Sequence, residues 1–291
     1  MKSASLSADG FTLEEPSIVF VQQLVASAIA NFGLNLDLLE GITILADYQH
    51  GVSQFDTGFE DGALSASEGS VVGVGMTPLV LRGAVLKCHI LLPRKVVDDA
   101  EMPDHSELAR KARYTISHEL GHCDDHQNLT SRFRAEAMDT AARRNVLDVG
   151  CRATWSEYYV CRLVAKECPE MLRDMEESTV RALESFGAES RIAAHYGSMG
   201  DREEGQRHAF GAGFNLFIVF ARLLGHLDGL GMSFQAECRI APAYLSNLVR
   251  IADVEELHRT LSALWTRRRD WTALKEVRQL LTPLSAILNR I

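Results

Sequence analysis

The chain has 291 residues and a mass of 32.2 kDa, with 30 Lys and Arg against 39 Asp and Glu. Its formal charge of −9 argues against a nucleic-acid module that depends on bulk positive charge, because phosphate binding usually shows as a basic excess. Apolar residues make up 46% and charged residues 24%, which is ordinary globular usage and excludes a disordered composition. A chain of this length suits one large domain or two small ones.

The sequence favours a cytoplasmic protein. The most apolar stretch, residues 209–221, is about half as long as a bilayer helix must be, and it contains Asn215. Glu14 and Glu15 precede the first apolar run, which is unlike a signal peptide. The six cysteines include no C-x-x-C pair and resemble free thiols in a reducing compartment: Cys88, Cys123, Cys151, Cys161, Cys168 and Cys238.

The first half of the chain predicts a helix followed by a small sheet. The opening dozen residues, rich in Ser, Ala and Gly, predict a frayed end, and apolar residues recur at helical spacing over 16–32. Thr12 and Glu15 form a capping-box signature, and Gly33 is a stop signal. A loop is predicted over 51–69, and strands are predicted at 42–46, 71–74 and 79–92, the last with a turn or bulge at Gly83.

After Pro103 the pattern is almost entirely helical. Helices are predicted at 106–126, 132–145, 156–166, 172–186, 207–224, 254–265 and 271–289. The stretch 209–224 is apolar nearly all round, which is typical of a central core helix. The fold class is therefore α+β, mainly helical. We expect a core at residues 1–170 and an all-helical region at 171–291 that packs on it and could bind a partner.

The segment that carries chemistry is His118-Glu119-Leu120-Gly121-His122, an H-E-x-x-H motif. A spacing of four places both imidazoles on one face of a helix, where they can bind one Zn²⁺. Glu119 lies at the edge of that face and can accept a proton from water. With 10 His in 291 residues, chance gives an expected count of only about 0.03 such motifs per chain.

A catalytic Zn²⁺ needs a third protein ligand, and we expect Glu157, at the start of the helix predicted after a Ser156 cap. Its alternative role is to complement the helix dipole. His126 is a minor candidate, because a continuing helix would aim it past the metal. Other nearby acidic residues more often form a solvated face or support the ligands: Asp124, Asp125, Glu136 and Asp139.

These residues resemble the ImmA/IrrE metallopeptidases, which are zincins of the gluzincin type. The resemblance rests on the H-E-L-G-H segment and on Trp155-Ser156-Glu157-Tyr158-Tyr159-Val160-Cys161 with its helical continuation. It covers roughly residues 15–170. It implies a minimal zincin core: an N-terminal helix, a small sheet, the H-E-x-x-H helix and a Glu-bearing helix. The longer segment between the two motif helices and Tyr158 after the ligand Glu depart from the family pattern.

The resemblance implies a Zn-dependent intracellular endopeptidase that cleaves a specific protein, often a regulator of the repressor type. His118, His122 and Glu157 would bind Zn²⁺, and Glu119 would be the general base. The oxyanion donor stays open among Tyr158, Tyr159, His195, Tyr196 and His208. Strand 79–92 could pair with an extended substrate. The alternative is a non-proteolytic regulatory protein that keeps the scaffold and the metal and binds a partner through its helical half.

Overall fold

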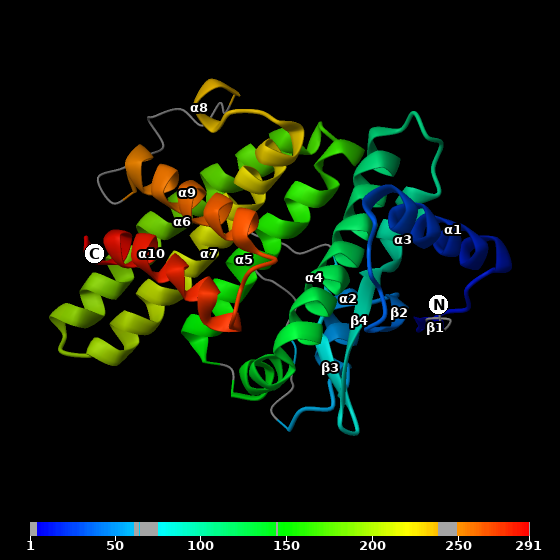
Figure 1. Ribbon diagram of the computed structural model, residues 1–291, viewed down its shortest axis with the longest axis horizontal. Coiled ribbons are helices and arrows are strands. Elements are labelled where there is room, and N and C mark those ends of the chain that lie inside the picture. Colours follow the sequence, from blue (N-terminus) through cyan, green and yellow to red (C-terminus); the bar gives the residue numbers. More distant parts are fainter. Residues whose placement is uncertain (1–4, 61–63, 65–74, 144, 238–248, 291) are drawn as a thin grey trace. The chain divides into compact units, whose positions relative to one another are not determined.

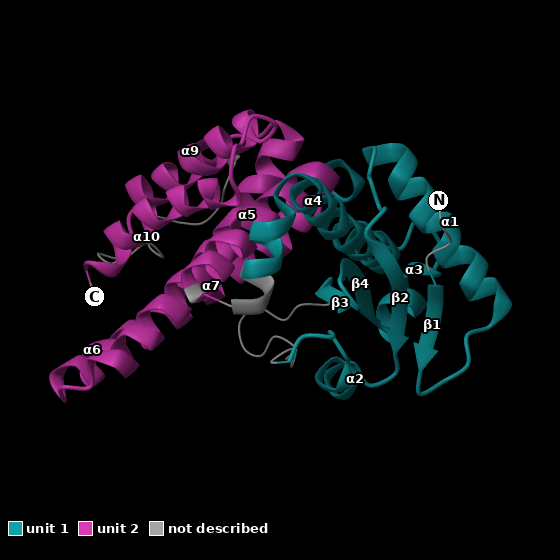
Figure 2. Ribbon diagram, turned by 60° about the horizontal axis from the view of Figure 1, so that its bottom comes forward, with its two compact units in different colours: residues 1–143, 166–168 teal, residues 144–165, 169–291 magenta. Residues whose placement is uncertain are grey.

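Figure 1 shows the protein as a computed structural model, which describes residues 5–60, 64, 75–143, 145–237 and 249–290. The chain forms two compact units (Figure 2). Unit 1 comprises residues 1–143 and 166–168, and unit 2 comprises residues 144–165 and 169–291. Most described residues are helical, and one small mixed sheet is present. The predicted α+β, mainly helical class is confirmed at this level.

Unit 1 contains a four-stranded sheet in the order β1-β2-β4-β3. β1 (Ser5–Asp9) and β4 (Val85–Pro93) run parallel to β2 (Leu39–Leu45) on its two sides, and β3 (Leu79–Arg82) pairs antiparallel with β4. The predicted turn is confirmed, since Gly83 joins β3 to β4 with a φ of 60°. For residues 5–9 the expected frayed end is wrong, because the backbone of β1 pairs with β2 along its whole length; residues 1–4 lie outside the described residues.

α1 (Glu15–Phe32) confirms the first predicted helix, and Gly33 ends it in the left-handed conformation with a φ of 66°. The predicted capping box is wrong. Glu14 is the N-cap residue, and it makes no side-chain capping hydrogen bond. The buried face of α1 is apolar and recurs at helical spacing, which explains why the helix was predictable although its cap was not.

The segment predicted as a loop at 51–69 begins inside a short helix, α2 (Tyr48–Gln54). The N-cap Asp47 starts α2 by accepting a hydrogen bond from the His50 N–H at 3.0 Å. Residues 55–60 are irregular, as expected. The strand predicted at 71–74 lies outside the described residues.

α4 (Glu107–Arg143) spans both helices predicted at 106–126 and 132–145. The predicted break between them is a kink: Phe133 has a φ of −129° and a ψ of 42° inside an otherwise helical run. α3 (Arg94–Ala100) and α4 both pack against β4, and α1 packs against α4. This packing positions the H-E-x-x-H motif beside the sheet.

Unit 2 begins with α5 (Val146–Val164), whose start lies well before the predicted start at Ser156. Asn145 caps α5 by accepting hydrogen bonds from the backbone N–H groups of Leu147 and Asp148, at 3.0 and 3.3 Å. Gly150 has a low helix propensity, so the first part of this helix was not predicted from the sequence. Its missing Cβ is needed, because a Cβ there would lie 2.3 Å from an atom of the Phe214 ring.

The remaining helices of unit 2 match the predicted helical pattern more closely. η1 (Ala165–Glu167) follows α5, and α6 (Met171–Ser198) runs through Gly187 and Gly197 without a break. Gly200, with a φ of 86°, turns the chain into α7 (Arg202–Leu230). The later elements are α8 (Phe234–Glu237), α9 (Ile251–Arg267), η3 (Leu274–Leu280) and α10 (Leu281–Leu288).

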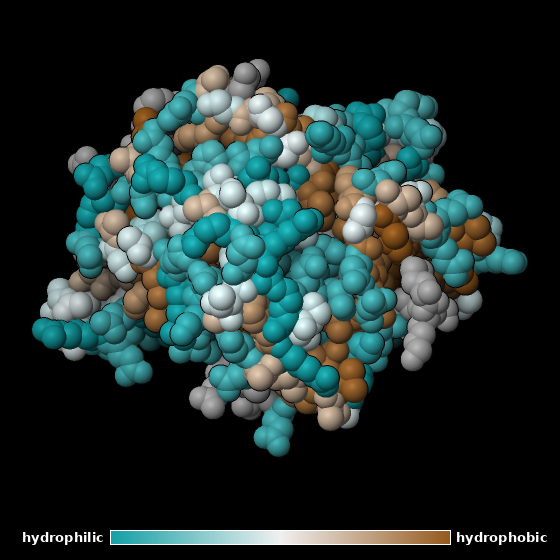
Figure 3. All heavy atoms as spheres, viewed as in Figure 1, coloured by the Kyte–Doolittle hydropathy of each residue, from teal (hydrophilic) through white to brown (hydrophobic). Residues whose placement is uncertain are grey.

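α7 is the core helix of unit 2, as predicted, and α5 and α6 both pack against it. It is also the one helix among the described residues that is long and apolar enough to cross a membrane, but 67% of its apolar window is buried. That burial is typical of the core helix of a soluble protein. Figure 3 shows hydrophilic side chains over much of the face in view, with smaller hydrophobic areas between them.

The functional division predicted at residue 170 stays a prediction. The two compact units are defined by packing contacts. Residues 144–165 pack with the C-terminal helices in unit 2, and residues 166–168 pack with unit 1.

Candidate metal centre

Two imidazoles converge on α4. His118 and His122 lie one turn apart, and their Nε2 atoms are 3.0 Å from each other. Two ligands of one tetrahedral zinc ion, each about 2.0–2.1 Å from it, lie about 3.3 Å apart. His118 is 7% exposed, and His122 is half-buried. The pair therefore has the spacing and the partial shielding that a single metal ion requires.

Glu119 is held beside this pair by the segment that leads into β3. Thr77 Oγ1 lies within hydrogen-bond distance of two Glu119 atoms, 2.7 Å from Oε2 and 3.0 Å from the backbone O. Gly75 lies against the same side chain, since a Cβ at position 75 would come within 2.8 Å of Glu119 Cγ. Glu119 is 6% exposed. A carboxylate fixed at the edge of the histidine face can take a proton from water placed there.

Residues 75–77 form an edge next to Glu119. Met76 and Leu91 exchange two backbone hydrogen bonds, at 3.0 and 2.8 Å. In an antiparallel ladder the neighbouring residues direct their backbone groups to the opposite side, so those of Gly75 and Thr77 face away from β4. His126 Nε2 lies 3.2 Å from Thr77 O and must donate, because a carbonyl only accepts. His126, the minor ligand candidate, thus contacts this edge.

The acidic residues that follow the motif divide into two groups. Asp124 and Asp125 are 5% and 1% exposed, so the expectation of a solvated face is wrong for them. Asp124 Oδ1 accepts a hydrogen bond from the Asn35 backbone N–H at 2.7 Å, which ties the segment after α1 to α4. Glu136 and Asp139 are exposed, as expected.

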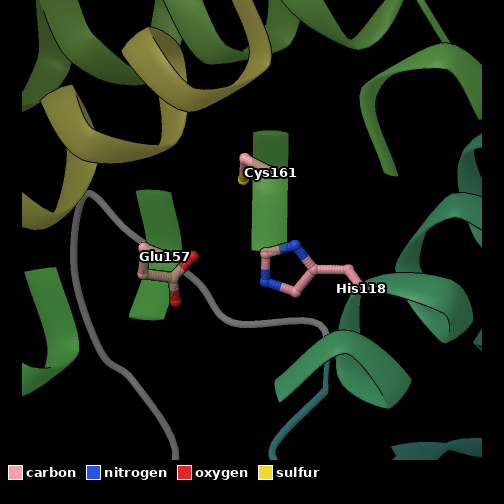
Figure 4. A group of neighbouring side chains, drawn as sticks. All are labelled: His118, Glu157 and Cys161. Carbon is pink, nitrogen blue, oxygen red and sulfur yellow. The ribbon is translucent and has the colours of Figure 1, made fainter. Parts of the chain in front are cut away.

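In unit 2, Glu157 and Cys161 lie one turn apart in the middle of α5 (Figure 4). Their ligand atoms lie within 4.8 Å of each other, and Cys161 is fully buried. Arg222 Nε, from α7, lies 3.6 Å from Glu157 Oε2. The expected first-turn position of Glu157 after a Ser156 cap is wrong, because α5 begins at Val146.

Glu157 and Cys161 of unit 2 offer a carboxylate and a thiolate that could help to hold a metal ion. Imidazole, carboxylate and thiolate suit several divalent metals, zinc among them. Cys161 was predicted only as a free thiol. The signal that could have identified it is its spacing of four residues from Glu157, which places both side chains on one helix face.

The oxyanion donors considered in unit 2 have other partners. Tyr158 has no exposed surface and hydrogen-bonds Asp228. His208 Nδ1 lies 2.8 Å from Glu189 Oε2, and its ring stacks on Tyr196 with centroids 5.4 Å apart. These contacts join helices within unit 2 and give each side chain a structural role.

Comparison of the chain with family models, with curated proteins and with solved structures gave no match.

Proposed function

We propose that the protein is a zinc-dependent endopeptidase. The observation that carries the proposal is the convergence of the His118 and His122 Nε2 atoms, 3.0 Å apart, beside the held carboxylate of Glu119. A site that only stabilises the fold has no need of a buried base at this position. The resemblance of the sequence to the ImmA/IrrE metallopeptidases supports the same function and suggests a cytoplasmic regulator as the protein substrate.

The residues present fit a zinc ion. His118 and His122 would hold it through Nε2, and Glu157 is the proposed third ligand. Cys161 is the alternative third ligand, since it offers a thiolate one turn from Glu157. A bound zinc would polarise the substrate carbonyl and make water a better nucleophile at neutral pH. Arg222, 3.6 Å from Glu157, would help to orient the ligand carboxylate.

Glu119 performs the proton transfers in this mechanism. Its carboxylate accepts a proton from water as the water oxygen bonds to the peptide carbon, and it later delivers that proton to the leaving amine. Thr77 holds Oε2 at 2.7 Å and so restricts the carboxylate to one orientation. The close approach of Gly75 leaves the carboxylate little room to swing away.

The edge at residues 75–77 is the proposed place for an extended peptide. The backbone groups of Gly75 and Thr77 face away from β4, so those of Gly75 and the Thr77 N–H can pair with a substrate strand beside Glu119, while the Thr77 carbonyl accepts from His126. The broader expectation for strand 79–92 needs correction. β4 lies between β2 and β3, so among the described strands β3 is the outer one on that side, and its Leu81 N–H already donates to Thr57 O at 2.7 Å.

The test compares wild type with Glu119→Gln, using bound zinc by mass spectrometry and cleavage of a fluorogenic peptide library. We expect unchanged zinc and a 10²–10⁴-fold loss of kcat, roughly the contribution of one general base. His118→Ala should lose both zinc and cleavage. Glu136→Gln, at an exposed position of the same helix, is the matched control and should keep both.

Cleavage by Glu119→Gln at the wild-type rate would refute the peptidase proposal. If zinc is bound and the biological effect of the protein survives this substitution, the non-proteolytic binding alternative is favoured. If His118→Ala kept its full zinc content, both the peptidase proposal and the binding alternative would be refuted.

A further inference from the structure

Tyr48 is a half-buried tyrosine near the proposed catalytic base, and its hydroxyl oxygen is buried. It is the first residue of α2, directly after the Asp47 cap. Its ring packs against a buried cluster formed by Leu45, Val52 and Leu91. These contacts hold the ring in place, and its hydroxyl takes no part in them.

The Tyr48 hydroxyl is buried and has no hydrogen-bond partner among the described residues. A buried hydroxyl that stays unpaired costs about 1–3 kcal/mol. Proteins satisfy nearly all such groups, so this hydroxyl is available to a partner that the described residues do not supply.

Two observations place Tyr48 close to Glu119. Met76 packs against the same cluster as Tyr48, and the neighbours of Met76 on both sides, Gly75 and Thr77, contact Glu119. Burial and the negative charge of Glu119 also raise the pKa of Tyr48 well above its ordinary value. The phenol therefore stays protonated, as a donor must.

We propose that Tyr48 is a catalytic residue of the proposed hydrolysis and that its O–H donates a hydrogen bond to the oxyanion formed from the substrate carbonyl. This inference rests on the proposed peptidase function. When the water oxygen bonds to the carbonyl carbon, the C=O π pair moves to the carbonyl oxygen and the water proton goes to Glu119. Tyr48 keeps its proton and stabilises the new negative charge.

The test is Tyr48→Phe, which keeps the packed ring and removes only the hydroxyl. We expect kcat to fall about 10²–10³-fold with little change in KM, which is the usual effect of removing one oxyanion donor. Binding of a phosphinic pseudopeptide built on the best-cleaved sequence should weaken about 10–100-fold, because its tetrahedral anion resembles the transition state. Zinc content should match wild type, and the melting temperature should be equal to or above that of wild type, because the variant no longer buries an unpaired hydroxyl. Tyr196→Phe, the same change in unit 2, should alter none of these quantities.

The outcomes separate this inference from the proposed function. If wild type cleaves peptides with dependence on Glu119 and Tyr48→Phe keeps its kcat and inhibitor affinity, the role of Tyr48 is refuted while the peptidase stands. A loss of kcat that accompanies lost zinc or a lower melting temperature would assign Tyr48 to the fold and also refute it. If wild type shows no cleavage that depends on Glu119, both the peptidase function and the role of Tyr48 are refuted.

Discussion

His226, on α7, is a histidine with no exposed surface. Burial lowers its pKa from 6.5 to about 4, although a contact of Nε2 with the Pro169 carbonyl at 3.4 Å acts in the opposite direction. Between pH 4 and 6.5 the unfolded chain therefore binds a proton that the folded chain does not. The stability associated with neutral His226 is present above about pH 6.5 and is lost as the pH falls to about 4.

His226→Gln removes this titration, so we expect unit 2 of the variant to lose less stability than wild type between pH 7 and 4. The difference should be about 3 kcal/mol, since one pKa unit corresponds to about 1.4 kcal/mol. Urea unfolding followed by tryptophan fluorescence measures it, because all three tryptophans lie in unit 2: Trp155, Trp265 and Trp271. The exposed His105→Gln should keep the wild-type pH dependence, and an equal dependence in His226→Gln would contradict the prediction.

Residue identities in the site were more predictable than residue contacts. The spacing of His118 and His122 already implied two imidazoles on one helix face, and the structure brings their Nε2 atoms together. Tyr48 gave no such signal. It is 71 positions from Glu119, and its relation to that residue depends on how β2, β4 and α4 pack. Local sequence patterns report neighbours along a helix or strand and carry little information on such long-range contacts.

At the scale of elements, close helix packing explains several differences between prediction and structure. α5 and α7 approach so closely that a Cβ on Gly225 would lie 2.4 Å from the Tyr158 backbone O. A Cβ on Gly229, one turn later, would lie 2.4 Å from the Arg162 backbone O. Glycine lowers helix propensity, so a helix rich in it is hard to predict from propensity alone. Tertiary packing overrides that preference in α7, as it does at Gly150 in α5.

Gly225→Ala should destabilise unit 2 by about 1–3 kcal/mol or more, because the added methyl group meets backbone that cannot swing aside. Gly211→Ala is the matched control on the same helix. A Cβ there meets nothing within 4 Å, so the better helix propensity of Ala should stabilise unit 2 by about 0.5–1 kcal/mol. Urea unfolding with tryptophan fluorescence measures both changes, and equal effects of the two substitutions would contradict the packing argument.

The strands with a recognisable side-chain pattern were predicted. β1, which joins the sheet through backbone pairing and has no such pattern, was not. The pair β3 and β4 has β-branched and apolar residues around a turn at Gly83, and this pattern identified it. β1 is Ser-Leu-Ser-Ala-Asp, short and mostly polar, and it joins the sheet through parallel pairing with β2. An edge strand of this kind depends on the strand that it pairs with, so the sequence of β1 alone could not reveal it.

At the scale of the whole molecule, the three proposed zinc ligands come from two distant segments of the chain. His118 and His122 lie in unit 1, whereas Glu157 lies in unit 2. If all three bind zinc, as proposed, the ion stabilises both α4 and α5. A ligand that binds only the folded state adds about 2.7 kcal/mol when its concentration is 100 times its Kd. Local opening that breaks the site should then become about 100-fold rarer in α4 and in α5.

Hydrogen exchange of the full chain, with and without zinc, tests this consequence. In wild type, zinc should slow exchange around residues 116–122 of α4 and around residues 155–161 of α5. Glu157→Ala should keep part of the effect in α4, where two imidazoles still bind, and lose the effect in α5. Glu184→Ala, an exposed position on α6, is the control and should behave as wild type. Slower exchange in α4 alone, with α5 unchanged in wild type, would show that zinc is held without Glu157 and that the third ligand lies elsewhere.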